Sequence, residues 1–106
     1  MEISQKTIDI SKGNDLFRQD FNRDRIVFTA SVDNSPHRNE IIQAVKSFND
    51  FDDDERGEHN FGVFTVAGEE YIFKIDYMDT AFEFTEDPYD TSVFERSMTI
   101  MKSDEL

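Results

Sequence analysis

The clearest fold signal in the chain is HNFGVFTVAGEEYIFKIDYM, residues 59–78, in which two runs of alternating side chains flank a short turn signal. In the second run, the aromatic and aliphatic residues from Tyr71 to Tyr77 share one face, with the period of two that is typical of a β-strand. The Ala-Gly pair between the runs favours a tight hairpin. We therefore predict two antiparallel strands, over residues 59–66 and 70–78.

Three further stretches carry strand patterns. RIVFTASV, residues 25–32, alternates in the same way, and AFEFT, residues 81–85, follows a turn at Met-Asp-Thr. The C-terminal segment 91–106 fits either a helix or a strand. We favour a strand through SMTIM, residues 97–101, because β-branched residues fit a pleated surface.

Two segments have helical patterns. Residues 4–20 predict a weakly amphipathic helix that Gly13 weakens further, with Asn14 and Asp15 able to restart it as an N-cap. NSPHRNEIIQAVKSFNDF, residues 34–51, is the stronger pattern. Ser35 is suited to cap it, Pro36 fits the first helical position, and one apolar stripe runs down to Phe51.

This order of elements predicts an α+β fold with two layers: an antiparallel sheet of four to five strands with two helices on one face. The 106 residues are enough for one domain, spanning 1–106, and too few for two. Eleven Phe and three Tyr with no Trp mean that aromatic rings supply much of the buried area.

Composition excludes several classes of protein. The chain has no Cys, so it has no disulfide framework, thiolate metal site or thiol nucleophile. No apolar run approaches the length of a membrane span, and the N-terminal residues lack the pattern of a secretory signal. We expect a cytoplasmic protein without a membrane partner.

Charge is distributed unevenly along the chain. Residues 1–49 contain seven acids and seven bases, whereas residues 50–106 contain 17 acids and four bases, so the whole net charge of −13 lies in the second half. Such a charge disfavours direct binding to DNA, RNA or an anionic membrane and favours a basic partner surface. Mutual repulsion favours a monomer, although an apolar edge strand near the C-terminus leaves a weak homodimer open.

The most acidic stretch is DFDDDERGEHNFG, residues 50–62. Asp50, Asp52 and Asp54 have the spacing of the first three ligands of an EF-hand, but that loop needs Gly at its sixth position and Glu at its twelfth, where Glu55 and Phe61 stand. We predict no metal or other cofactor, and interpret the stretch as a solvated loop that ends a helix. A loose divalent-cation site over residues 50–58 stays open as an alternative.

Neither histidine has the spacing of a metal-binding pair. We expect His59 to be partly buried and to anchor the loop to the sheet by hydrogen bonds. Lys74 and Asp76 lie two residues apart on one strand face and are placed to form an ion pair. We predict no catalytic residues; a metal-dependent enzyme using Glu58, His59 and Asp76 is the less favoured alternative.

Four segments together resemble a bacterial domain of unknown function, family 3768, which occurs in plasmid and prophage-associated genomes. They are NDLFR (14–18), RIVFTASV (25–32), GEHNFGVF (57–64) and YIFKIDYMD (71–79), with a weaker similarity at SMTIMKSDEL (97–106). The family pattern has a His before the glycine and an Asp after the second His, where this chain has Arg56 and Asn60. The resemblance implies a fold neighbourhood without an activity, and both departures argue against catalysis there.

Charge and resemblance together predict a small, non-catalytic binding protein. Thirteen net charges equal those on roughly 22 Å of duplex DNA, so the acidic surface can imitate nucleic acid to a protein that binds it. The concrete hypothesis is a phage or mobile-element inhibitor of a host defence complex, of the anti-CRISPR or antirestriction type. The alternative is a housekeeping or regulatory interaction domain with incidental acidity. We expect the partner to contact these acids and aromatic anchors: Asp50, Asp52, Asp53, Asp54, Glu55, Glu58, Asp76, Asp79, Glu83, Glu86, Asp87, Asp90, Phe51, Tyr77 and Tyr89.

Overall fold

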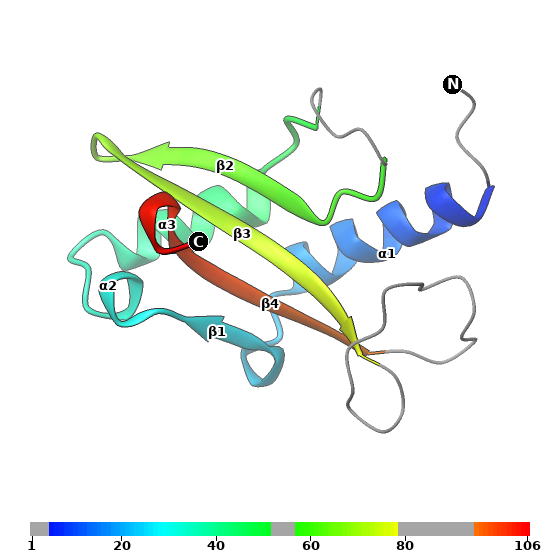
Figure 1. The fold of residues 1–106 in the computed structure, drawn as a ribbon, viewed down its shortest axis with the longest axis horizontal. Coiled ribbons are helices and arrows are strands. Elements are labelled where there is room, and N and C mark those ends of the chain that lie inside the picture. The colour runs from blue at the N-terminus through cyan, green and yellow to red at the C-terminus, as the bar shows by residue number, and fades with distance from the viewer. Residues whose placement is uncertain (1–4, 52–56, 79–94) are drawn as a thin grey trace.

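The computed structural model describes residues 5–51, 57–78 and 95–106, and Figure 1 shows how their elements are arranged. The elements follow the order α1 (Gln5–Asp20), η1 (Arg23–Arg25), β1 (Ile26–Phe28), α2 (Ala30–Asp33), α3 (Arg38–Ser47), β2 (Phe61–Val66), β3 (Glu69–Met78), β4 (Glu95–Lys102) and η2 (Ser103–Glu105). The α+β class is therefore confirmed. The predicted strand at 81–85 lies outside the described residues.

The four strands form one sheet in the order β1-β4-β3-β2. β3 pairs antiparallel with both β2 and β4, but β1 pairs parallel with β4. The sheet is thus mixed, not purely antiparallel as predicted. The reason is a crossover: the chain leaves β1 at one edge, passes through α2 and α3, and re-enters the sheet at the opposite edge as β2.

The β2–β3 hairpin follows the sequence prediction closely. Val66 pairs with Glu69, which leaves Ala67 and Gly68 as a two-residue turn. Both turn residues have left-handed backbone angles, with φ of 53° and 80° respectively. Left-handed turns match the twist of the flanking strands, and glycine adopts them without the steric cost that alanine incurs.

The first strand is shorter than predicted. Only Ile26–Phe28 pair with β4, and Thr29 then becomes the N-cap of the one-turn helix α2. The amide of Asp33 donates to the carbonyl of Thr29 at 2.9 Å, which is a helical bond. Fully buried Val32 fits this turn as well as it fits a strand, so alternation alone could not separate the two.

Both predicted helices exist with changed boundaries. α1 continues through Gly13, so Asn14 and Asp15 do not restart it. α3 begins at Arg38 and not at Pro36, because His37 serves as its N-cap while the amide of His37 donates to the hydroxyl of Ser35 at 3.1 Å. α3 ends at Ser47, before the residues that continued the predicted stripe.

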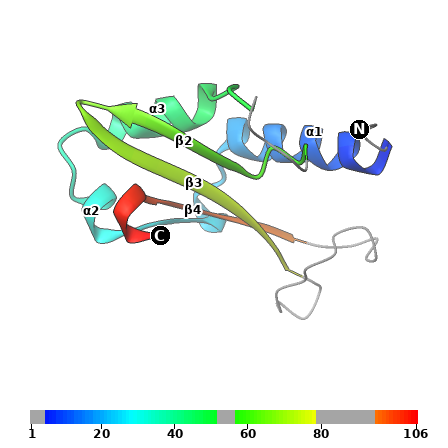
Figure 2. The same ribbon diagram turned by 45° about the horizontal axis from the view of Figure 1, so that its top comes forward.

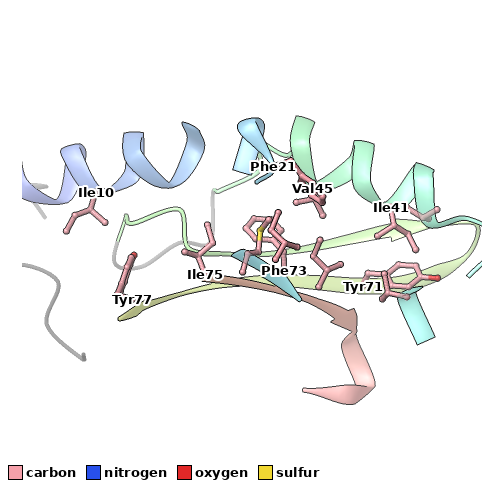
Figure 3. Packing of buried hydrophobic residues seen from close by; sticks show 13 residues of the cluster. Ile10, Phe21, Ile41, Val45, Tyr71, Phe73, Ile75 and Tyr77 are labelled. Atoms are coloured by element: carbon pink, nitrogen blue, oxygen red, sulfur yellow. The ribbon is translucent and has the colours of Figure 1, made fainter. Parts of the chain in front are cut away.

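The core residues lie between α1 and α3 and the sheet, as Figure 3 shows. The predicted face of β3, from Tyr71 to Tyr77, is buried there, together with Ile41 and Val45 of α3. Fully burying one such aliphatic side chain contributes roughly 1.5–3 kcal/mol. Figure 2 shows α1 and α3 beside the sheet in a second view.

The C-terminal segment is a strand, as favoured. β4 buries Met98 and Ile100 in the core and lies inside the sheet between β1 and β3. The strand predicted near the C-terminus as a homodimer edge therefore lies inside the sheet; of the described strands, β1 and β2 are the outermost. Among the helices of the described residues, none has the length and apolar character needed to cross a membrane.

Candidate functional site

A buried polar network lies where α1 meets the C-terminal end of β3 and the N-terminal end of β4. Its centre is Asn14, whose side chain is 0% exposed. The Asn14 amide donates to the carbonyl of Glu58 and to the hydroxyl of Tyr77, each at 2.8 Å. Its carbonyl oxygen accepts a 2.6 Å bond from Nε of Arg96. The Asn14 side chain thus joins four parts of the chain: α1, β3, β4 and the segment that precedes β2.

Gly13 makes room for this arrangement. A Cβ at Gly13 would lie 2.4 Å from a terminal nitrogen of Arg96, which is closer than real contacts allow. The glycine that weakened the helical pattern therefore has a packing reason, because it lets the guanidinium of Arg96 lie against α1 and reach Asn14. Burial lowers the pKa of Arg96, and the nearby Tyr77 acts in the opposite direction.

Glu58 and Tyr77 form the inner pair of the network. Glu58 is 2% exposed, and the Tyr77 hydroxyl donates to its Oε1 at 2.8 Å. Burial raises the pKa of Tyr77 most; the bond from Asn14 lowers it, and the Glu58 carboxylate raises it again. The phenol therefore keeps its proton and serves as the donor to Glu58.

A second cluster lies beside the first and is more exposed. Nδ1 of His59 lies 3.0 Å from Oδ1 of Asp15, and since a carboxylate only accepts, Nδ1 carries the proton. The imidazole stacks on the ring of Phe51, with centroids 3.9 Å apart and planes 2° apart. His59 has a left-handed backbone with φ of 59°, a strained conformation for a non-glycine residue that these contacts hold in place.

Arg18 connects this cluster to the core. The Arg18 side chain is buried. Its Nη1 lies 3.0 Å from Oδ1 of Asp15, and its Nη2 donates to the backbone carbonyl of Phe48 at 2.7 Å. Its guanidinium also lies over the rings of Phe51 and Phe73, at 5.2 and 5.5 Å from their centroids. A planar, weakly hydrated guanidinium suits such a position, so Arg18 fixes the end of α3 and the start of the acidic stretch against α1.

The network changes the interpretation of two predicted partner contacts. Glu58 and Tyr77 were expected on an exposed acidic surface, but both side chains are buried and bonded to each other. Phe51 is partly buried and stacks on His59. Only Asp50 and Asp76, of the predicted acids that the structure describes, have substantial exposure, and Asp76 lies 3.7 Å from Lys74 in the predicted ion pair.

The remaining predicted contacts are outside the described residues: Asp52, Asp53, Asp54, Glu55, Asp79, Glu83, Glu86, Asp87, Asp90 and Tyr89. The structure does not bring together the alternative enzyme set. Glu58 bonds to Tyr77. Asp76 is the residue immediately before Tyr77 on β3, so its side chain points to the opposite face of the sheet. Within residues 5–51, 57–78 and 95–106, no group of three His, Asp or Glu side chains is placed to hold a metal ion.

His59 is partly buried, as predicted, and its contact with Asp15 joins it to α1. Sequence reasoning missed Asn14, Asp15, Arg18 and Arg96. A signal for the first three existed, since polar residues at i, i+1 and i+4 beside a mid-helix glycine are unusual on a core-facing helix. Nothing in the local sequence distinguishes Arg96, because its role depends on a contact 82 positions away.

Comparison with known proteins identifies the family. The family model described as "Protein of unknown function (DUF3768)" matches residues 27–105, and the chain therefore belongs to this family. The predicted resemblance is confirmed for most of the chain, but its NDLFR segment at 14–18 precedes the matched range. No curated protein and no solved structure matches the chain.

Proposed function

We propose that this member of the DUF3768 family is a non-catalytic binding protein whose acidic surface engages a basic surface of a nucleic-acid-binding protein. The concrete form is a cytoplasmic inhibitor, encoded by a phage or mobile element, that occupies a host defence nuclease in place of its nucleic acid. This corresponds to an anti-CRISPR or antirestriction protein. The alternative, an interaction domain whose acidity is incidental, predicts a partner whose binding does not depend on salt.

The observation that carries the proposal is the Glu58–Tyr77 hydrogen bond of 2.8 Å. Glu58 lies two residues after the acid-rich stretch 50–56, and Tyr77 lies two residues before the acid-rich stretch 79–94. Together these stretches contain ten acids and one base, which is −9 of the total −13. The bond thus joins two described residues that each lie two positions from an acid-rich stretch.

Concentrating charge in this way has a physical consequence. Clustered like charges attract a basic partner over long range and increase its association rate. If the same charges were spread evenly over the surface, salt would screen them from one another and the attraction for the partner would be weaker. The cost is self-repulsion, and the buried bonds of Asn14, Arg18 and Arg96 join the elements that bear it. Such binding weakens as salt rises, because electrostatic attraction is screened.

The test is an inhibition assay with a matched charge control. DNA cleavage by purified restriction and CRISPR nucleases is measured with the wild type and with two triple variants. One variant neutralises Asp52, Asp53 and Asp54 to Asn; the control neutralises Asp20, Asp24 and Asp104, which are exposed elsewhere. We expect the first variant to lose inhibition by about tenfold or more and the control by about threefold or less.

Two results would refute the proposal. Equal loss in both triple variants would mean that total charge matters and its position does not. Inhibition that does not change between low and high salt would mean that the acidic surface does not carry the binding. A variant neutralising Glu83, Glu86 and Asp87 shows which of the two acidic stretches the partner contacts.

A further inference from the structure

The β2 edge of the sheet has an outward row of backbone groups. β2 is the last strand in the order β1-β4-β3-β2, at the upper edge in Figure 1. The amide of Ile75 donates to the carbonyl of Asn60 at 2.7 Å, which makes these residues a hydrogen-bonded pair. Since such pairs alternate along an antiparallel ladder, the backbone groups of Phe61, Val63 and Thr65 point away from β3.

The same three residues have exposed side chains. Phe61 is 42% exposed and Val63 is 46% exposed, and Thr65 is exposed as well, whereas Gly62 is buried and Phe64 half-buried between them. Among the backbone hydrogen bonds outside regular elements in the described part of the chain, none involves Phe61, Val63 or Thr65. Backbone donors, backbone acceptors and alternate apolar side chains thus line one edge.

Within the described residues, this edge shows none of the usual sequence protections of a sheet edge. Proteins block edges with lysine, proline, bulges or very short strands. The chain has no Lys, Arg or Pro between Arg56 and Lys74, and β2 pairs with β3 without interruption over six residues. The opposite edge differs: β1 has three residues, and Arg23 and Arg38 lie over the ring of its Phe28.

We propose that β2 accepts an extended, positively charged segment of a partner protein as an additional strand. Charge selects this occupant, because five acids at 50–55 precede the strand and Glu69 and Glu70 follow it. A second copy of this chain would bring the same acids together and is disfavoured. The inference rests on the proposed function for the sign of the partner's charge; the backbone geometry of the edge is independent of it.

Hydrogen exchange tests the geometry and the binding together. The probe is a synthetic peptide of alternating lysine and valine, as long as β2, and amide exchange is followed by NMR. In the free protein we expect fast exchange at Val63 and Thr65 and slow exchange at Phe64 and Val66, whose amides face β3. Saturation with the peptide should slow exchange at Val63 and Thr65 by about tenfold or more.

Proline variants isolate the backbone contribution. Val63→Pro removes an outward amide but no bond to β3, which an edge strand tolerates, and Val63→Thr is the matched control that keeps the amide. Thr65→Pro removes the next outward amide. We expect each proline variant to stay folded by circular dichroism and to weaken peptide binding by about tenfold, while the threonine variant stays within about threefold.

Several results would overturn the inference, and they separate it from the proposed function. Slow exchange at Val63 and Thr65 in the free protein would mean that the edge is already covered. Equal binding of a lysine–proline peptide, which cannot form a strand, would reject strand addition while leaving the electrostatic proposal intact. Equal binding of a glutamate–valine peptide would keep the edge but reject the charge argument, and with it the proposed function.

Discussion

Replacing Asn14 with alanine should destabilise the protein more than any other single polar substitution in the described network. Asn14→Ala removes three hydrogen bonds, to the Glu58 carbonyl, the Tyr77 hydroxyl and the Arg96 guanidinium. Each ordinary bond contributes about 0.5–1.5 kcal/mol and the bond to the charged Arg96 about 1.5–3 kcal/mol. Alanine recovers about half a kcal/mol in helix propensity.

The expected loss is therefore about 3–4 kcal/mol, a large part of the roughly 5–15 kcal/mol that stabilises a domain. Urea unfolding followed by circular dichroism measures it, and the thermal midpoint should fall by about 15 °C. Asn39→Ala is the matched control, since Asn39 is exposed on α3 and undergoes the same change in helix propensity. It should change stability by less than about 0.5 kcal/mol.

A cost of less than about 1 kcal/mol for Asn14→Ala relative to Asn39→Ala would contradict this prediction, because the three bonds would then contribute nothing beyond solvation. A double-mutant cycle with Tyr77→Phe adds a second criterion. Asn14 and Tyr77 share a bond and a common partner in Glu58, so the two losses should fall short of additivity by about 0.5–3 kcal/mol. Strict additivity would show that the network is not cooperative.

Three further predictions concern single residues. The pKa of Tyr77 is raised from its ordinary value of 10.0, so the folded protein holds this proton more tightly than the unfolded chain and stability falls as pH rises above about 10. Tyr77→Phe should therefore flatten the alkaline limb of a stability–pH curve. An unchanged limb would exclude Tyr77 as its source. The pKa of Glu105 is lowered from 4.5, mainly by the hydrogen bond from the amide of Lys102 and also by those from the hydroxyls of Thr29 and Ser31. The contribution of the Glu105 carboxylate to stability is therefore present at neutral pH and lost on acidification. An NMR titration of Glu105 should give a midpoint below 4.5, and a midpoint at or above that value would contradict these bonds. Ala67→Asn should stabilise the hairpin by about 0.5 kcal/mol, because asparagine tolerates the left-handed backbone of this turn. Ala67→Val should destabilise the protein in the same urea unfolding assay. The reverse order would mean that the turn has another conformation.

Local patterns predicted those elements whose signals lie within a few residues. Alternation from Tyr71 to Tyr77 assigned the buried face of β3, and the Ala-Gly pair assigned the hairpin turn. The same rule overextended the first strand, because Val32 satisfies both a strand and one turn of helix. Pairing with β4 stops at Phe28, and only that long-range contact decides between the two conformations.

The candidate site was predictable only in part. The sequence singled out Glu58 and His59 as residues of note, yet it placed Glu58 on the surface because carboxylates are rarely buried. The buried position of Glu58 is fixed by Tyr77, which donates to its carboxylate, and by Asn14, which donates to its backbone carbonyl. Neither relation has a local signature, since the partners are 19 and 44 positions away.

The α+β class, the hairpin, the absence of cysteine chemistry and the concentration of negative charge in the second half of the chain could all be predicted from the residues alone. These follow from periodicity and composition, which are properties of neighbouring residues or of simple counts. The tertiary structure added that β1 runs parallel to β4, that β2 is the last of the described strands on one side of the sheet, and that Asn14 joins Glu58 to Tyr77. The physical reason is that these features arise from contacts between segments far apart in the chain, and such contacts are selected by shared burial and hydrogen bonding in three dimensions.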